Sequence, residues 1–131
     1  MPTLFTRIID RELPAAFVWE DDRCVAFLAK DASRPGHLLV VPREEVDHWL
    51  DADDALMAHL LRTSRTIGRA QQRAFPSEKV AVVVVGLEVP HLHLHLIPID
   101  GIGDVDFTSV RRDVPMEELE AAAAAIRAQL D

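Results

Sequence analysis

The amino-acid sequence predicts an α+β fold built on one antiparallel sheet of about five strands. Short β-rich runs are joined mostly by short connections, and one long amphipathic helical pattern separates the third run from the fourth. Shorter helical patterns stand near the two ends. The chain has 131 residues, a length that supports one hydrophobic core rather than two. We therefore expect a single domain over residues 1–131, with its core in about 3–100 and a C-terminal loop and helix in 101–131.

Charge and cysteine content exclude several classes of protein. Asp and Glu number 22 against 14 Lys and Arg, and the formal net charge of −8 repels nucleic-acid backbones and anionic membranes. Cys24 is the single cysteine, which excludes an internal disulfide framework and a multi-cysteine zinc module. No apolar run reaches the roughly 18–20 residues of a membrane span, and no signal peptide is recognisable. We expect a cytoplasmic protein without nucleic-acid or membrane partners.

The N-terminal elements follow from apolar spacing. Apolar residues at helical intervals predict a short helix that starts near Leu4 and ends near Pro14. Residues 17–19 and 24–28 are β-rich runs, and the acidic segment 20–23 between them is typical of a hairpin turn.

The middle of the chain combines a strand with the long helix. Segment 29–36 contains Pro and Gly and is expected to be a loop. It leads into a strand at 37–41 that Pro42 stops. Acidic residues at 51–54 favour a helix start, and apolar residues at intervals of three to four predict an amphipathic helix from about 52 to 74.

The last third contains two further strands and a helix. Residues 80–85 are nearly all β-branched and predict a buried strand, which a turn at 86–90 connects to an alternating strand at 91–98. The segment 101–113 is rich in Gly and Asp and is expected to be a loop. Pro115 then opens the final amphipathic helix.

Three histidines alternate with leucines in the strand expected at 91–98. Because side chains of a strand alternate between its faces, His91, His93 and His95 share one face, and their rings stand ~6.5–7 Å apart along it. A neutral imidazole can attack phosphorus. Neighbouring rings that are protonated or that donate an N–H can stabilise phosphoryl oxygens. The pattern therefore favours a catalytic site for a phosphorylated substrate.

Two other interpretations of the histidines stay open from the residues alone. A strand with one solvent-facing side can carry His on that side without any function. Alternatively, a His-x-His pair can ligate a metal ion when a further ligand such as His37 joins it.

The alternating motif, HLHLHLI over residues 91–97, resembles the signature of the histidine triad (HIT) family. Two further stretches are similar to that family: PGHLLVVP over residues 35–42, and Gly86 with the Val89–Pro90 pair before the triad. The acidic turn before the second β-run also resembles the family's early hairpin. The resemblance covers about residues 3–100. It implies the HIT α+β fold, usually as a homodimer in which two sheets join.

The resemblance also implies roles for four histidines. His93, the middle one, is expected to be the nucleophile that forms a nucleotidyl-histidine intermediate. His95 contacts the scissile phosphate and assists proton transfer, while His91 supports the other rings and His37 lies near the network. A His rather than a Gln at position 95 is typical of the hydrolase branch. The implied substrate is a nucleoside 5′-monophosphate that bears a leaving group on its α-phosphate, as in a phosphoramidate or a dinucleoside polyphosphate.

The predicted substrate-binding residues depart from the family pattern. Ala29 stands where HIT proteins commonly place an Asp that binds the ribose, and its neighbour Lys30 is a candidate for a substitute contact. Leu87 stands where the family has a Gln that holds the phosphate, followed by Glu88 and Val89. These departures support a second hypothesis, namely that the chain is a catalytically weak HIT-fold protein that binds a nucleotide or another ligand and has a regulatory role.

The family's structural zinc site is also altered. Many bacterial members bind zinc through an N-terminal Cys-x-x-Cys and a His, and this chain has Thr3, Thr6 and Glu45 at those positions. The sequence therefore predicts neither a bound metal nor a cofactor.

Overall fold

The computed structural model describes residues 2–130 and has the predicted α+β architecture. Its five strands form one antiparallel sheet in the order β1-β2-β3-β5-β4. The strands are β1 (Phe17–Glu20), β2 (Cys24–Leu28), β3 (Leu38–Pro42), β4 (Lys79–Val83) and β5 (Leu94–Ile99). The α-helices are α1 (Leu4–Ile9), α2 (Asp54–Ala74) and α3 (Met116–Arg127), and the 3₁₀ turns are η1 (Trp49–Asp51) and η2 (Ile102–Asp104).

Three predicted boundaries are wrong. Helix α1 ends at Ile9 rather than near Pro14, since Arg11 adopts a left-handed φ of 65° that an α-helix cannot contain. Strand β4 ends at Val83 instead of continuing to residue 85, and it is exposed to half-buried rather than buried, because it lies at an edge of the sheet within residues 2–130. Strand β5 begins at Leu94, because the two residues after Pro90 are bonded elsewhere. The amide of Leu92, for example, donates to the carbonyl of Val46.

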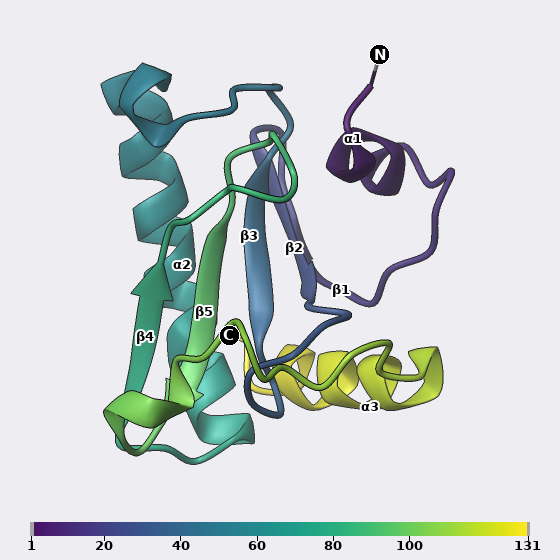
Figure 1. Ribbon diagram of the computed structural model, residues 1–131, viewed down its shortest axis with the longest axis vertical. Coiled ribbons are helices and arrows are strands. Elements are labelled where there is room, and N and C mark those ends of the chain that lie inside the picture. Colours follow the sequence, from purple (N-terminus) through teal and green to yellow (C-terminus); the bar gives the residue numbers. More distant parts are fainter. Residues whose placement is uncertain (1, 131) are drawn as a thin grey trace.

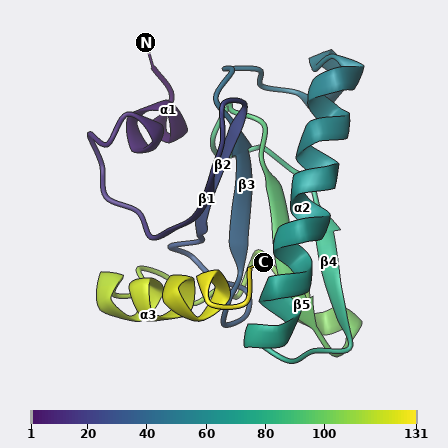
Figure 2. The same ribbon diagram turned by 180° about the vertical axis from the view of Figure 1, so that it is seen from behind.

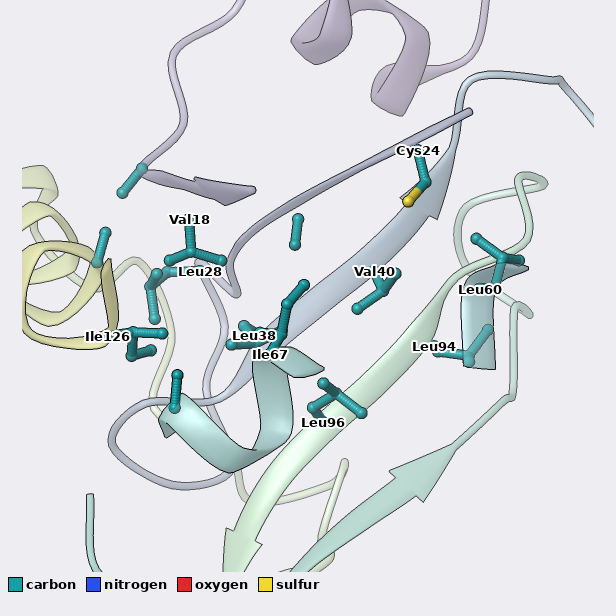
Figure 3. Packing of buried hydrophobic residues seen from close by; sticks show 14 of the residues in the cluster. Val18, Cys24, Leu28, Leu38, Val40, Leu60, Ile67, Leu94, Leu96 and Ile126 are labelled. Carbon is teal, nitrogen blue, oxygen red and sulfur yellow. The ribbon is translucent and has the colours of Figure 1, made fainter. Parts of the chain in front are cut away.

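Helices α2 and α3 cover one face of the sheet. In Figures 1 and 2, α2 runs along the strands and α3 lies across their lower end. Side chains of alternate strand positions, such as Leu38, Val40, Leu94 and Leu96, meet both helices in the larger core, part of which Figure 3 shows. Burial of this apolar surface is the main stabilising contribution to the fold.

The opposite face carries the smaller core and the histidines. Helix α1 packs there against a second cluster that consists of Phe5, Ile8, Ile9, Val25, Phe27, Ala29, Leu39 and Val41. Leu39 is paired with His95 across β3 and β5. Because directly opposite residues of an antiparallel pair share a face, His95 points to the side of α1. The face that α2 and α3 leave free is therefore where the site forms.

None of the helices within residues 2–130 combines the length and the apolar character that crossing a bilayer requires.

Candidate active site

Four histidines from two parts of the sequence converge on the α1 face. The ring centroids of His93 and His95 lie 4.8 Å apart, and those of His37 and His95 lie 5.2 Å apart. His91, His37 and His93 expose only 0%, 1% and 6% of their surfaces. Strand β5 supplies His95, the segment before it supplies His91 and His93, and His37 immediately precedes β3. The structure thus brings together all four histidines that the sequence singled out.

A backbone carbonyl determines where the proton of His93 sits. The Nδ1 atom of His93 lies 2.7 Å from the carbonyl oxygen of His91. A carbonyl can only accept a hydrogen bond, so Nδ1 carries the proton and donates it. In the neutral ring, Nε2 therefore holds a lone pair, which is the form that a nucleophilic imidazole needs.

His91 is fixed in the same way from two sides. Its Nε2–H donates to the carbonyl of Pro42 at 2.7 Å. Its Nδ1 lies 2.6 Å from the Thr3 hydroxyl, which donates to the lone pair of the neutral ring. Phe5 also packs edge-on against His91 and His93, with centroid distances of 5.7 and 4.8 Å. His91 therefore connects α1 to the end of β3 while its own carbonyl orients His93.

His37 and His95 form a second chain of hydrogen bonds. The amide of Ser33 donates to Nδ1 of His37 at 2.9 Å, so the proton of the neutral His37 ring is on Nε2. That Nε2–H points at Nδ1 of His95, 2.9 Å away, which must accept. The proton of His95 is consequently on its Nε2. Sequence reasoning missed Ser33, because nothing in the loop indicated which amide would face a ring.

Burial keeps the four rings neutral. Desolvation, together with a smaller effect of the nearby His93, lowers the pKa of His37 to about 4 and that of His95 to about 3. Burial likewise lowers the pKa of His93 and of His91. Of the two ways in which a neighbouring ring can stabilise a phosphoryl oxygen, the structure therefore favours donation from a neutral N–H over a protonated ring.

A largely apolar pocket of about 580 Å³ lies next to α1, and no histidine is among its lining residues in the described part of the chain. Phe5, which touches His93, forms part of its wall. Its lining includes Leu4, Phe5, Ile8, Phe27, Leu39 and Met116. Apolar walls next to a few polar groups are typical of sites for small molecules. Helix α1, β2, β3 and the start of α3 thus contribute to one concave surface.

The predicted substrate-binding residues are less concentrated than the histidines. Lys30 lines the apolar pocket, and its exposed ammonium lies 3.4 Å from a carboxylate oxygen of Asp113. Ala29 is buried in the smaller core. Leu87 and Glu88 lie in the exposed part of the turn before the histidines, and 89% of the Leu87 surface is exposed. Val89 is half-buried against the smaller core.

Hydrogen bonds connect Thr3, Thr6 and Glu45, the positions for which the family resemblance implied a structural zinc site. A carboxylate oxygen of Glu45 accepts from the Thr6 hydroxyl at 2.6 Å and from the Thr3 amide at 2.7 Å. Structural zinc sites are built from thiolate, imidazole and carboxylate ligands, and the two threonine hydroxyls are none of these. The residues therefore do not fit a structural zinc ion.

One group of potential metal ligands lies outside the histidine site. Within residues 2–130, the side chains of Asp21, Cys24 and His59 are the only three whose ligand atoms all lie within 4.8 Å of one another. Asp21 also caps the β1–β2 turn by accepting from the amides of Arg23 and Cys24. It accepts from Nε2 of His59 at 2.9 Å. Burial raises the pKa of Cys24 to about 12, so its sulfur stays a thiol, which is a poor ligand.

Comparisons with known proteins agree on one family. A family model described as the HIT domain matches residues 10–102. An uncharacterized HIT-like protein of Synechococcus elongatus is 38% identical over 101 residues, which cover 72% of this chain and 88% of the relative. The crystal structure of a Hit-like protein involved in cell-cycle regulation from Bartonella henselae has a TM-score of 0.86 and 32% identity. The similarity covers 98% of this chain and 96% of that one.

A third similar protein is described as a hydrolase. The HIT family hydrolase from Legionella pneumophila has a TM-score of 0.62 and 32% identity, with coverage of 72% of this chain and 90% of its own. The matched residues 10–102 contain His37 and the whole HLHLHLI motif. The fold, the four converging histidines and the match over most of the chain lead to one conclusion: this protein belongs to the HIT family.

Proposed function

We propose that the protein is a hydrolase that cleaves nucleoside monophosphate derivatives at the α-phosphate through a nucleotidyl-histidine intermediate on His93. The observation that carries the proposal is the hydrogen bond from Nδ1 of His93 to the carbonyl of His91, which leaves a lone pair on Nε2. The lowered pKa of His93 supports it, since the ring is neutral at neutral pH. Phosphoramidates and dinucleoside polyphosphates are the two substrate classes that the family resemblance implies.

The reaction proceeds in two steps on the residues of this chain. In the first, the lone pair of His93 Nε2 forms a bond to the α-phosphorus, and the bond from phosphorus to the leaving group breaks with its electron pair. The leaving atom takes up one proton from solvent. In the second, water attacks phosphorus, releases His93 and gives one proton back to solvent. The net change is addition of one water, which yields a nucleoside monophosphate. His95 Nε2–H donates to a phosphoryl oxygen in both steps.

The apolar pocket is the proposed place for the nucleoside. Phe5 and Phe27 line the pocket and Phe5 also contacts His93, so a base held there places its 5′-phosphate near Nε2. Lys30 lines the same pocket and is the proposed substitute contact for the ribose or the phosphate. Ala29 offers no ribose anchor, and Leu87 and Glu88 leave the turn without an amide for the phosphate. We therefore expect weaker nucleotide binding than a member with those groups would have.

The alternative function is binding without efficient turnover. Ala29 and the exposed Leu87 favour it, because both remove groups that orient a nucleotide for reaction. In that case His93 and the pocket hold a nucleotide or a similar ligand, and the bound form acts on another process.

One assay separates the two functions. Release of adenosine monophosphate from adenosine 5′-phosphoramidate is measured for the wild type, for His93→Ala and for the control His48→Ala. His48 is exposed and lies outside the site. The proposal predicts turnover in the wild type and in the control, with a loss of at least about 100-fold in His93→Ala. Nucleotide binding by calorimetry without turnover above background supports the alternative instead, and equal rates in all three proteins overturn the hydrolase.

We further propose that two copies of the chain join through β4. Strand β4 is an edge of the sheet as ordered in residues 2–130 (Figure 1), and unpaired edges readily accept another strand. Leu61, Val82 and Val85 expose 50%, 49% and 48% of their surfaces on or near this edge. A second copy would cover them. Light scattering should find a dimer that Val82→Lys converts to a monomer, and a wild-type monomer at micromolar concentration would refute the proposal.

A further inference from the structure

A second cavity, of about 370 Å³, lies between α3, the loop 29–36 and Phe75 at the C-terminal end of α2. Helix α3 crosses the lower end of the sheet in Figures 1 and 2 and forms one wall of this cavity. No residue of α1 or of the 91–97 motif is among its lining residues within residues 2–130. The cavity is therefore separate from the pocket next to α1, although Leu28, Val114 and Leu119 line both.

Small side chains on α3 explain why the space is not filled. Ala121, Ala122 and Ala125 line the cavity with single methyl groups, whereas protein interiors are normally packed without such gaps. The atoms around an unfilled space lack dispersion contacts that a bound molecule would restore. A concave site of this size with mostly apolar walls is typical of small-molecule sites, so its ligand should have an apolar body.

Arg34 lines the cavity and offers a hydrogen-bond donor that no protein atom uses. Its Nη1 lies 3.1 Å from a carboxylate oxygen of Asp104, and its Nη2 lies 3.4 Å from one of Asp100. Its Nε is buried and has no hydrogen-bond partner among the residues from 2 to 130. A buried donor without an acceptor is unfavourable, because it has lost its hydrogen bonds to water. An oxygen of a bound molecule can accept this hydrogen bond.

The charges around the cavity favour an uncharged ligand. Arg111 and Glu118 line it as an ion pair, and Arg34 already faces two carboxylates. Three carboxylates thus accompany two guanidinium groups, so a ligand carboxylate or phosphate would meet a local excess of negative charge. A carbonyl oxygen can accept from the Nε–H of Arg34 without adding a charge.

We propose that this cavity binds a small uncharged molecule that has an apolar or aromatic body and one carbonyl oxygen, which accepts from Nε of Arg34. The site does not require the hydrolase activity proposed above. It adjoins the residues that orient His37, since Ser33 lines the cavity and its amide donates to Nδ1 of His37. A bound molecule therefore lies against the loop segment that determines which nitrogen of His37 carries the proton, and the Ser33 amide reports its binding.

The test compares three small ligands of similar size. Acetophenone has an aromatic ring and one carbonyl, ethylbenzene lacks the carbonyl, and benzoate carries a negative charge. Each is titrated into the isotope-labelled full chain while the backbone amide signals are followed by NMR. We expect acetophenone to shift the amides of Ser33, Gly36 and Ala122 with a Kd on the order of 1 mM. It should bind about 10-fold more tightly than ethylbenzene, which is the usual effect of one hydrogen bond, and more tightly than benzoate.

Variants of α3 locate the binding site. Ala122→Leu should fill the cavity and abolish the shifts caused by acetophenone. Ala125→Leu fills it from the next turn of the helix and, because Ala125 is exposed, keeps the test valid if the first variant does not fold. Ala124→Leu is the matched control, since Ala124 is exposed and does not line the cavity. The control should bind acetophenone as the wild type does.

Arg34→Lys tests the hydrogen bond, because it keeps a positive charge beside Asp100 and Asp104 but has no Nε–H. It should remove most of the preference for acetophenone over ethylbenzene. The proposal is overturned if the wild type binds both ligands equally, if acetophenone causes no shifts at its solubility limit, or if binding survives both cavity-filling variants. Shifts of the same amides that grow with protein concentration, without any ligand, would assign the cavity to a second copy of the chain instead.

Discussion

At the scale of single residues, the nitrogen that carries the proton in each buried imidazole is determined by hydrogen-bond partners that can only donate or only accept. The carbonyls of His91 and Pro42 accept, and the amide of Ser33 donates. Each choice determines the proton of one ring and, through it, what that ring offers to a substrate. His93 offers a lone pair and His95 offers an N–H. This division of roles requires rings that are neutral, which burial ensures.

The neutral state of His93 leads to a pH prediction. Protonation of Nε2 removes the lone pair, so kcat/KM should fall as the pH falls through the pKa of His93. Because burial lowers that pKa below its ordinary value of 6.5, the midpoint of the acid limb should lie below pH 6.5, with a plateau from about 7 to 8. Initial rates from pH 5 to 8, corrected for acid hydrolysis of the phosphoramidate, provide the measurement. His48→Asn should give the same profile, and a midpoint above 6.5 would contradict the assignment.

At the scale of elements, α1 is tied to the site by side chains rather than by the sheet. Thr3, its N-cap, bonds to His91, and Thr6 bonds to Glu45, which follows β3. The same short helix supplies Phe5 to the pocket wall and to the ring of His93. Thr3 also donates its amide hydrogen to Glu45. We therefore expect the hydrogen bonds of Thr3 and Thr6 to hold α1 in the position that forms the pocket wall.

Removal of the Thr3 hydroxyl should weaken the attachment of α1 to the histidine site. In Thr3→Val the buried Nδ1 of His91 loses its donor, which should cost about 1–3 kcal/mol of unfolding free energy. We expect KM for the nucleotide to rise more than kcat falls, because the pocket wall is affected more directly than His93. Urea unfolding and steady-state kinetics test both effects. The matched control Thr66→Val, at an exposed position of α2, should change neither by much.

The loop 29–36 packs closely against the C-terminal end of α2, where Gly36 lies against the ring of Phe75. Gly36 has a φ of +85°, and a Cβ at this position would lie 2.6 Å from a ring carbon of Phe75. Gly36→Ala should therefore reduce the unfolding free energy by roughly 1–3 kcal/mol, through the strained φ and through displacement of the ring. Gly101→Ala is the matched control, because nothing lies within 4 Å of the added Cβ. Thermal unfolding in which both variants melt alike would contradict this explanation.

At the scale of the whole molecule, the two faces of the sheet have different tasks. One face is sealed by α2 and α3 over the larger core (Figure 3), and the other carries a smaller core and the four histidines. The site therefore lies on a well-supported sheet, and both α1 and the segment 100–113 contact its histidines. The net charge of −8 does not conflict with a phosphate-bearing substrate, because the local groups are neutral imidazoles.

Burial of neutral histidines should make the fold sensitive to acid. The pKa of His37 is about 4 and that of His95 about 3, whereas both lie near 6.5 in the unfolded chain. The unfolded chain then binds more protons than the folded protein between these values, so the unfolding free energy falls as the pH falls below 6.5. Their contribution is fully present above pH 6.5. We expect a loss on the order of a few kcal/mol between pH 7.5 and 4.5.

Urea unfolding across this pH range measures the effect. His95→Asn should flatten the dependence, because a side chain that does not titrate replaces one that does. His48→Asn, at an exposed position, should leave the slope unchanged. A free energy of unfolding that stays constant down to pH 4.5 would show that the rings accept protons in the folded state.

The sequence by itself determined the order of the elements and identified the histidines that converge on the candidate site. Strand periodicity predicted that the HLHLHLI motif would place its histidines together and its leucines in the core, and the PGHLLVVP stretch predicted the neighbouring strand with His37. Both are local patterns, since a side chain's face depends only on its position in the strand. The departures at Ala29 and Leu87 were likewise visible without coordinates.

Only the tertiary structure decided the partners of those histidines. Thr3 lies 88 residues from His91 in sequence, and Pro42 lies 49 residues from it. Ser33 faces His37 because of the path of the loop 29–36, and Phe107 reaches His95 because the segment 100–113 folds back onto that loop. Such pairings arise when distant segments pack around one sheet, so no local periodicity encodes them. The residue types were therefore readable from the sequence, whereas the positions of their protons depended on contacts that form only in the folded chain.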